Sequence, residues 1–164
     1  MFRRVIALLV LALPCSPASA SSRSVMNDFG LAGTWSLDCS KDAEKQSGGY
    51  RMTVNAPIFG TATSYSVMRL QDGKLLITKN EIEGALRLTE SKIQLTINPI
   101  ERSIGGQLQP REGVFSSKLL VTYEKVGQKI HVFDAHSPDG KYVTAEDGHF
   151  ANGVASPMLE RCFD

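Results

Sequence analysis

Histidines and acidic residues are the side chains of this chain that could bind a metal ion. The set consists of His131, Asp134, His136, Asp139, Asp147 and His149. His131 and His136 are an odd number of positions apart and point to opposite faces of a strand, whereas turns could bring the others to one end of a sheet. Zinc accepts two histidines with carboxylates. Asp-Gly turns also gather acids at hairpin tips, however, and the spacing matches no metal motif, so the sequence predicts no metal and no cofactor.

The motifs of common enzyme families are also missing from the sequence. It contains no Gly-x-Ser-x-Gly, no Cys-x-x-Cys and no phosphate-binding glycine loop. The acidic residues Asp38, Glu81, Glu83 and Glu160 have no spacing that would place two carboxylates together for acid–base catalysis. We therefore expect that the chain is not an enzyme.

The first twenty residues have the three parts of a secretory signal peptide. Arg3 and Arg4 precede an apolar run over residues 5–13, and Ala18-Ser19-Ala20 offers a cleavage site. The run is much shorter than the roughly 20 residues that a membrane-spanning helix needs. The sequence therefore predicts a signal peptide over residues 1–20 and a periplasmic or secreted product, with a retained anchor as the alternative. Cys15 follows a proline, which argues against lipid attachment, and no later stretch predicts membrane insertion.

Cys39 and Cys162 are the two cysteines that follow this segment. An even pair in an exported protein predicts a disulfide, with two free thiols as the alternative. The bond would close a very long loop and stabilise the fold by about 4–5 kcal/mol in the chain-entropy model. If the sheet closes on itself, the same bond would fasten its first strand to its last.

Charge and length restrict the classes of partner. The formal net charge is +1, and removal of residues 1–20 takes away two arginines and no acid. Single lysines and arginines are scattered along the chain, whereas proteins that bind nucleic acid concentrate them in one patch. We expect a single domain that binds no nucleic acid and is a monomer.

Alternating apolar and polar residues predict short strands from residue 33 onward. Residues 50–56 and 92–98 alternate with a period of two, and tight turns are predicted near Asp72-Gly73, Glu90-Ser91 and Gly127. Two further turns are predicted at Asp139-Gly140 and Asp147-Gly148. Consecutive hairpins without helical crossovers favour an up-and-down sheet, and closure of a long sheet removes its edges. The predicted fold over residues 33–164 is all-β, an up-and-down antiparallel β-barrel of about eight to ten strands; a two-sheet sandwich is the alternative.

Two segments stand outside this pattern. Residues 21–32 form a predicted N-terminal tail with one short helical turn that Asn27 or Asp28 could cap. Residues 99–112 contain two prolines and Gly105-Gly106 and are predicted to form a long loop. Such loops serve as lids or are insertions without a role.

The sequence LAGTWSLD, with Gly33 and Trp35, resembles the opening motif of lipocalins and their lipocalin-like bacterial relatives. The resemblance implies an eight-stranded barrel with a cavity or a packed core, and an arginine of the last strand that crosses the tryptophan. Arg161 is the candidate for that arginine. A register that places Cys162 opposite Cys39 would leave it too far from the indole. From the alternation alone, Trp35 points inward and covers one end of the core.

A second resemblance is to small periplasmic inhibitors of secreted metalloproteases. Their barrel carries an N-terminal tail that enters the protease cleft, and residues 21–32 would correspond to that tail. Those inhibitors have a disulfide between cysteines that are close in sequence, whereas Cys39 and Cys162 lie at opposite ends of this chain.

The alternation also nominates residues for the barrel interior. They are Met52, Val54, Tyr65, Val67, Ile77, Leu86, Leu95, Val121 and Phe133. Small polar residues between them would leave a partly open cavity if they pointed inward. The favoured interpretation is that Ser64 and Ser66 face solvent.

Two functions remain open at this stage. The first is that the barrel binds a small apolar or amphipathic ligand, with residues 99–112 as a cover. The second is that the protein is an interaction module, such as a protease inhibitor or an envelope-associated partner, which uses residues 21–32 or 99–112.

Overall fold

A computed structural model describes residues 21–163, so the predicted signal peptide lies outside the described part of the chain. One sheet of eleven strands contains every strand of that part. The strands are β1 (Gly33–Ser36), β2 (Tyr50–Asn55), β3 (Ala62–Arg69), β4 (Leu75–Arg87), β5 (Lys92–Ile104), β6 (Gln107–Leu108), β7 (Leu119–Val126), β8 (Lys129–His136), β9 (Val143–Glu146), β10 (His149–Phe150) and β11 (Leu159–Cys162). An α-helix, α1 (Ser22–Phe29), precedes them, and a short 3₁₀ helix, η1 (Gly113–Ser116), precedes β7.

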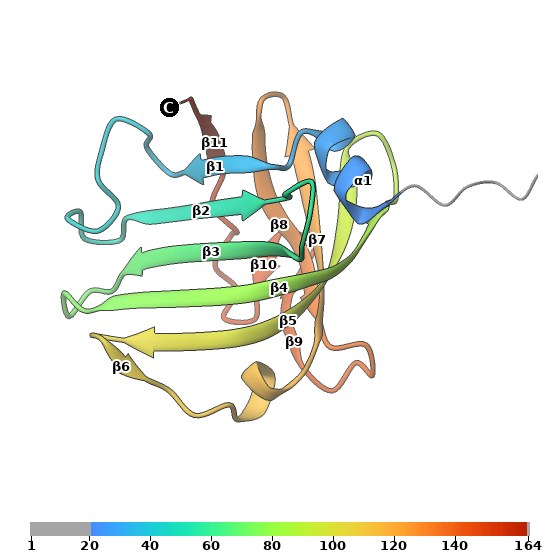
Figure 1. The fold of residues 1–164 in the computed structure, drawn as a ribbon. Coiled ribbons are helices and arrows are strands. Elements are labelled where there is room, and N and C mark those ends of the chain that lie inside the picture. The colour runs from blue at the N-terminus through green and yellow to red at the C-terminus, as the bar shows by residue number, and fades with distance from the viewer. Residues whose placement is uncertain (1–20, 164) are drawn as a thin grey trace, which may run out of the picture.

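Eight of these strands close into an antiparallel barrel, which confirms the predicted fold class. β1 to β5 pair in order, β5 pairs with β7, and β7 pairs with β8. β11 completes the ring because it pairs with β8 on one edge and with β1 on the other. β6, β9 and β10 are additions outside the ring. Figure 1 shows β1 to β4 side by side across the front, with β7 and β8 behind them.

Four of the five predicted turns contain a glycine with a positive φ angle; the turn at Glu90-Ser91 does not. Gly73 has φ 80° between β3 and β4, and Gly127 has φ 63° between β7 and β8. Asp147 and Gly148 both have positive φ, at 48° and 76°. Two such residues between β9 and β10 form the hairpin turn that matches the twist of the strands.

Helix α1 closes one end of the barrel. The Ser21 hydroxyl accepts a hydrogen bond from the Ser24 amide, so Ser21 caps the helix; the predicted caps Asn27 and Asp28 lie inside it. Met26, Phe29 and Leu31 are buried in the core. The helix packs against the far half of β4, where β4 and β5 curve around it in Figure 1. Residues 21–32 thus contribute three buried side chains to the core. Within residues 21–163, no helix is both long enough and apolar enough to cross a bilayer.

The prediction of a long loop over residues 99–112 is wrong. β5 continues to Ile104 because β4 offers it a partner along its whole length. The register shifts between Lys79 and Asn80, and this bulge accommodates Pro99, which cannot donate to the ladder. Gly105 and Gly106 then form a tight turn into β6, both with positive φ.

Gly148 should be sensitive to substitution. A Cβ at this position would lie 3.0 Å from Cε1 of His131, whereas one at Gly153, with φ 78°, would meet nothing within 4 Å. We expect Gly148→Ala to lower the free energy of unfolding by about 2 kcal/mol and Gly153→Ala to lower it by about 1 kcal/mol. Alanine has a strained backbone at both positions, because both have positive φ, but only at position 148 does it also crowd the buried ring of His131. Urea unfolding of the two variants measures this difference. Equal losses would contradict it.

Candidate functional site

An apolar pocket opens at the end of the barrel opposite α1. Its volume is about 350 Å³. Apolar side chains from six different parts of the chain form its wall: Leu37, Met68, Leu76, Val132, Phe150 and Leu159. Phe150 is 36% exposed at the rim. It belongs to the β9–β10 hairpin, which lies outside the ring of eight strands.

Four residues with hydroxyl groups line the same pocket: Ser156, whose hydroxyl accepts from the Val132 amide over 3.0 Å, and Tyr50, Ser66 and Thr78, which the strand register places together. Tyr50 pairs with Met68, and Met68 pairs with Leu76, so these three share a face at the rim. Two residues further along the same strands, Ser66 pairs with Thr78. Because side chains alternate along a strand, Ser66 and Thr78 share that face and lie one step deeper.

Ser66 and Thr78 form a hydrogen-bonded floor. The oxygens of Ser66 and Thr78 are 2.6 Å apart. Burial raises the pKa of the Tyr50 phenol, and a hydrogen bond with Ser66 partly offsets this shift. Tyr50 therefore stays neutral at physiological pH and serves as a hydrogen-bonding group.

Below this floor the barrel is filled. The Tyr123 hydroxyl donates to the sulfur of Met52 over 3.2 Å, and burial raises the pKa of the Tyr123 phenol strongly. Trp35 lies in the same core, and its indole Nε1 donates to the Leu31 carbonyl over 2.8 Å. The predicted position of Trp35 as a cover of the core therefore agrees with the structure. The cavity occupies only the half of the barrel away from α1.

The residues proposed to line the interior divide into two groups. Met52, Val54, Leu95 and Val121 are buried in the packed core and do not line the pocket. The other five lie outside this core: Tyr65, Val67, Ile77, Leu86 and Phe133. Tyr65 is 43% exposed, Leu86 is 59% exposed, and Phe133 lies under the ammonium group of Lys92, 3.1 Å from its ring centroid. Val67 is 5% exposed and therefore buried, but it lies outside the core cluster and does not line the pocket; the assignment of the other four to the interior is wrong.

The strand β3 explains part of this correction. Ser64 is buried, and Asn80 donates to its hydroxyl over 3.1 Å. Ser66 lines the pocket. Tyr65 and Val67 point the other way by alternation. The favoured interpretation that the two serines face solvent is therefore wrong: both face the interior, and Ser66 lines the open cavity.

Arg161 lies directly opposite Trp35 in the β1–β11 register. Its guanidinium carbon is 5.9 Å from the centroid of the indole, and its nitrogens donate to the carbonyls of Gly30 and Ala32. A Cβ at Gly33, which has φ 130°, would lie 3.3 Å from Nη2 of Arg161. The expectation that Arg161 lies too far from the indole is therefore wrong. The absence of a side chain at Gly33 leaves room for the Arg161 guanidinium.

The predicted disulfide between Cys39 and Cys162 is present, with 5.3 Å between the two Cα atoms. The register pairs Cys162 with Thr34, however, and not with Cys39. The chain bends after β1, and the Cys39 amide donates to the carboxylate of Glu160 over 3.0 Å. This bend explains how the bond and the close Trp35–Arg161 pair coexist at one seam.

The histidines and aspartates make separate local contacts. His131 contacts Glu124 at 3.2 Å, and ring nitrogens of His136 and His149 lie 3.0 Å from nearby backbone carbonyls. Asp139 accepts from the Ser137 hydroxyl and the Lys141 amide, and the first of these bonds lowers the pKa of its carboxyl most. In the described part of the chain, no three such residues are placed to hold one metal ion.

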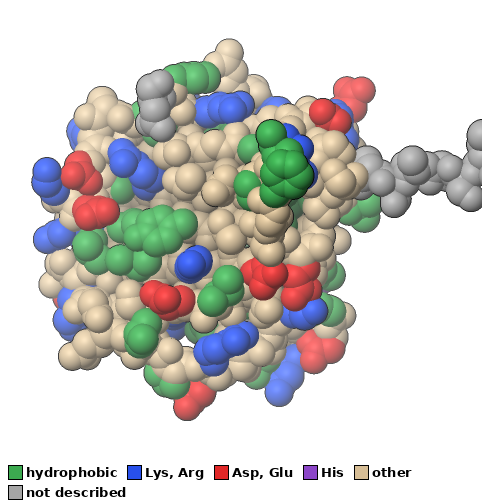
Figure 2. Space-filling model, viewed as in Figure 1, with side chains coloured by type: hydrophobic (Ala, Val, Ile, Leu, Met, Phe, Trp, Pro, Cys, Tyr) green, Lys and Arg blue, Asp and Glu red, His purple; other side chains and the backbone are tan. Residues whose placement is uncertain are grey.

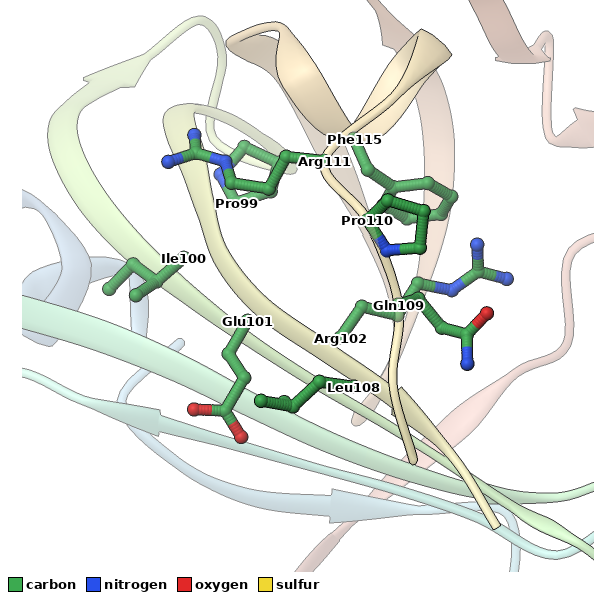
Figure 3. A pocket seen from close by; sticks show the side chains of 9 residues that line it. All are labelled: Pro99, Ile100, Glu101, Arg102, Leu108, Gln109, Pro110, Arg111 and Phe115. Carbon is green, nitrogen blue, oxygen red and sulfur yellow. The ribbon is translucent and has the colours of Figure 1, made fainter. Parts of the chain in front are cut away.

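A second, smaller pocket of about 230 Å³ lies beside residues 99–112, the segment predicted to cover a ligand. Figure 3 shows Pro99 and Pro110 on its sides and Phe115 of η1 above it. The Arg102 guanidinium stacks on Phe115, with 3.9 Å from its carbon to the ring centroid. Charged side chains of Glu101, Arg102 and Arg111 line it, so it is a poorer host for an apolar molecule than the barrel pocket.

On the face of the molecule in Figure 2, blue and red side chains are interspersed with apolar ones. Comparison of the chain with models of protein families, with curated proteins and with solved structures finds no match. The site therefore has to be interpreted from its own geometry.

Proposed function

We propose that this protein is an exported barrel that binds a small apolar or amphipathic molecule in the pocket at the end opposite α1. The observation that carries the proposal is the pocket of about 350 Å³ with an apolar wall and four hydroxyl-bearing residues. Ligand sites are typically concave, mostly apolar and supplied with a few polar groups, in volumes of about 300–1,000 Å³. The pocket is at the small end of this range, which suits a small ligand.

Export to the periplasm is part of the same proposal. The predicted signal peptide and the Cys39–Cys162 disulfide support it, because such bonds persist in oxidising compartments. The Gly33, Trp35 and Arg161 arrangement supports the proposed relation to lipocalin-like barrels. We favour ligand binding over insertion of the N-terminal tail into a protease, since Met26, Phe29 and Leu31 of that tail are buried in the core.

A bulky substitution in the pocket wall should abolish binding. We expect Leu76→Trp to weaken the affinity for N-phenyl-1-naphthylamine, a neutral dye that fluoresces in apolar surroundings, by at least about tenfold, or about 1.4 kcal/mol. Leu88→Trp is the matched control, because Leu88 is exposed at the α1 end of the barrel. It should leave the dye affinity unchanged. Fluorescence titration measures both, and a wild-type protein that binds no dye, or equal effects of the two variants, would refute the proposal.

A further inference from the structure

The hydroxyl floor has hydrogen-bonding capacity to spare. Ser66 and Thr78 share one hydrogen bond, with 2.6 Å between their oxygens. The two hydroxyls carry two protons and this bond uses one, so one O–H donor of the pair is left for Tyr50 or for a ligand. In the described part of the chain, no side chain other than Tyr50 competes for that donor. Both residues line a pocket with apolar walls, where an acceptor would find little competition from water.

The described residues that line the pocket include no Lys, Arg, Asp, Glu or His. An ion that enters such a site loses its hydration and finds no group of opposite charge, so its transfer from water into the pocket costs much free energy. An uncharged carbonyl, ether or hydroxyl loses less and regains a hydrogen bond at the floor. The lining therefore selects against both anions and cations.

The rim is less polar than the floor. Leu37 and Phe150 are partly exposed where the pocket opens, at 38% and 36%. If a ligand bound with its polar end outward, its apolar end would lie at the floor and the O–H donor there would have no acceptor. The opposite orientation places the apolar part against Met68, Leu76 and Leu159 and the polar end at the hydroxyls.

We propose that the pocket is selective for neutral amphipathic molecules with a terminal hydrogen-bond acceptor, which bind with the polar end at Ser66 and Thr78 and the apolar chain towards the rim. This inference rests on the proposed ligand-binding function and specifies the class and the orientation of the ligand.

Three compounds with the same ten-carbon chain and different charge test the selectivity. Decan-1-ol, decanoate and decyltrimethylammonium would each compete at pH 7 with N-phenyl-1-naphthylamine bound to the wild-type protein. We expect decan-1-ol to bind at least about tenfold more tightly than either ion, a ratio equal to about 1.4 kcal/mol. Equal or tighter binding of either ion would overturn the selectivity.

A double variant tests the orientation. Ser66→Ala with Thr78→Val removes the floor hydroxyls at nearly constant shape and should weaken decan-1-ol about tenfold or more, while the dye affinity stays within about threefold. Thr63→Val, on the outer face of β3, is the matched control and should keep the wild-type affinity. If the double variant does not fold, Ser66→Ala alone is measured, with a smaller loss expected.

The two proposals fail in different ways. Dye binding with no preference among the three compounds, or no effect of the floor variants on decan-1-ol, would overturn the neutral, polar-end-inward mode and leave ligand binding intact. Absence of binding for the dye and for all three compounds in the wild-type protein would overturn both.

Discussion

Loss of the Cys39–Cys162 disulfide is expected to lower the free energy of unfolding by about 5 kcal/mol in the chain-entropy model. The two cysteines are 123 positions apart, so the bond restricts nearly the whole unfolded chain. It also fastens β11 to the segment after β1, at the seam where the ring of strands closes. A loss of this size would remove a third or more of the roughly 5–15 kcal/mol that stabilises a typical domain.

Urea unfolding of the oxidised protein, with and without dithiothreitol, measures the effect. The variant with Cys39→Ala and Cys162→Ala should match the reduced wild type. It is also the control for the reductant, because dithiothreitol should not change its unfolding midpoint. A difference below about 1 kcal/mol between the oxidised and reduced proteins would show that the seam holds without the bond.

Phe29→Ala is expected to lower the free energy of unfolding by about 3–5 kcal/mol. Phe29 is 1% exposed and belongs to the same core cluster as Trp35. Lys125 donates to its carbonyl over 2.6 Å and lies over its ring. Truncation would leave a cavity under α1 that the rigid barrel cannot fill.

Asp28→Ala is the matched control for Phe29→Ala, because Asp28 is the preceding residue of α1 and is exposed. Its effect should stay within about 0.5 kcal/mol. Urea unfolding of both variants distinguishes a structural helix from a free arm. A loss below about 1 kcal/mol for Phe29→Ala would mean that residues 21–32 contribute little to the core, and would restore the interpretation of this segment as an inserting tail.

The sequence predicted the features that depend on neighbouring residues. Turn dipeptides such as Asp72-Gly73 and Asp147-Gly148 locate the hairpins, because they supply residues that adopt positive φ at little cost. The hairpin order then predicted the barrel. The number and position of the cysteines predicted the disulfide. None of these conclusions required knowledge of a distant partner strand.

The sequence did not predict the candidate site. A period of two shows that Ser64 and Ser66 share one face of β3 and that Tyr65 and Val67 share the other, but not which face is inside. Pro99 and Gly105 suggested a loop, whereas pairing with β4 extends β5 through Pro99 at a bulge. Arg161 was misplaced because the bend after β1 lets Cys39 reach Cys162 out of register.

The sequence by itself thus determined where the chain turns, that its strands are antiparallel and that its ends are joined, since local backbone preferences and cysteine chemistry fix these. Only the tertiary structure decided which face of β3 lines the cavity, how far β5 extends and that α1 fills one end of the barrel. Each of these depends on contacts between segments far apart in sequence, and a one-residue change of register would reverse every inward side chain. The pocket between Ser66, Thr78 and Leu76 exists only because these distant pairings are fixed.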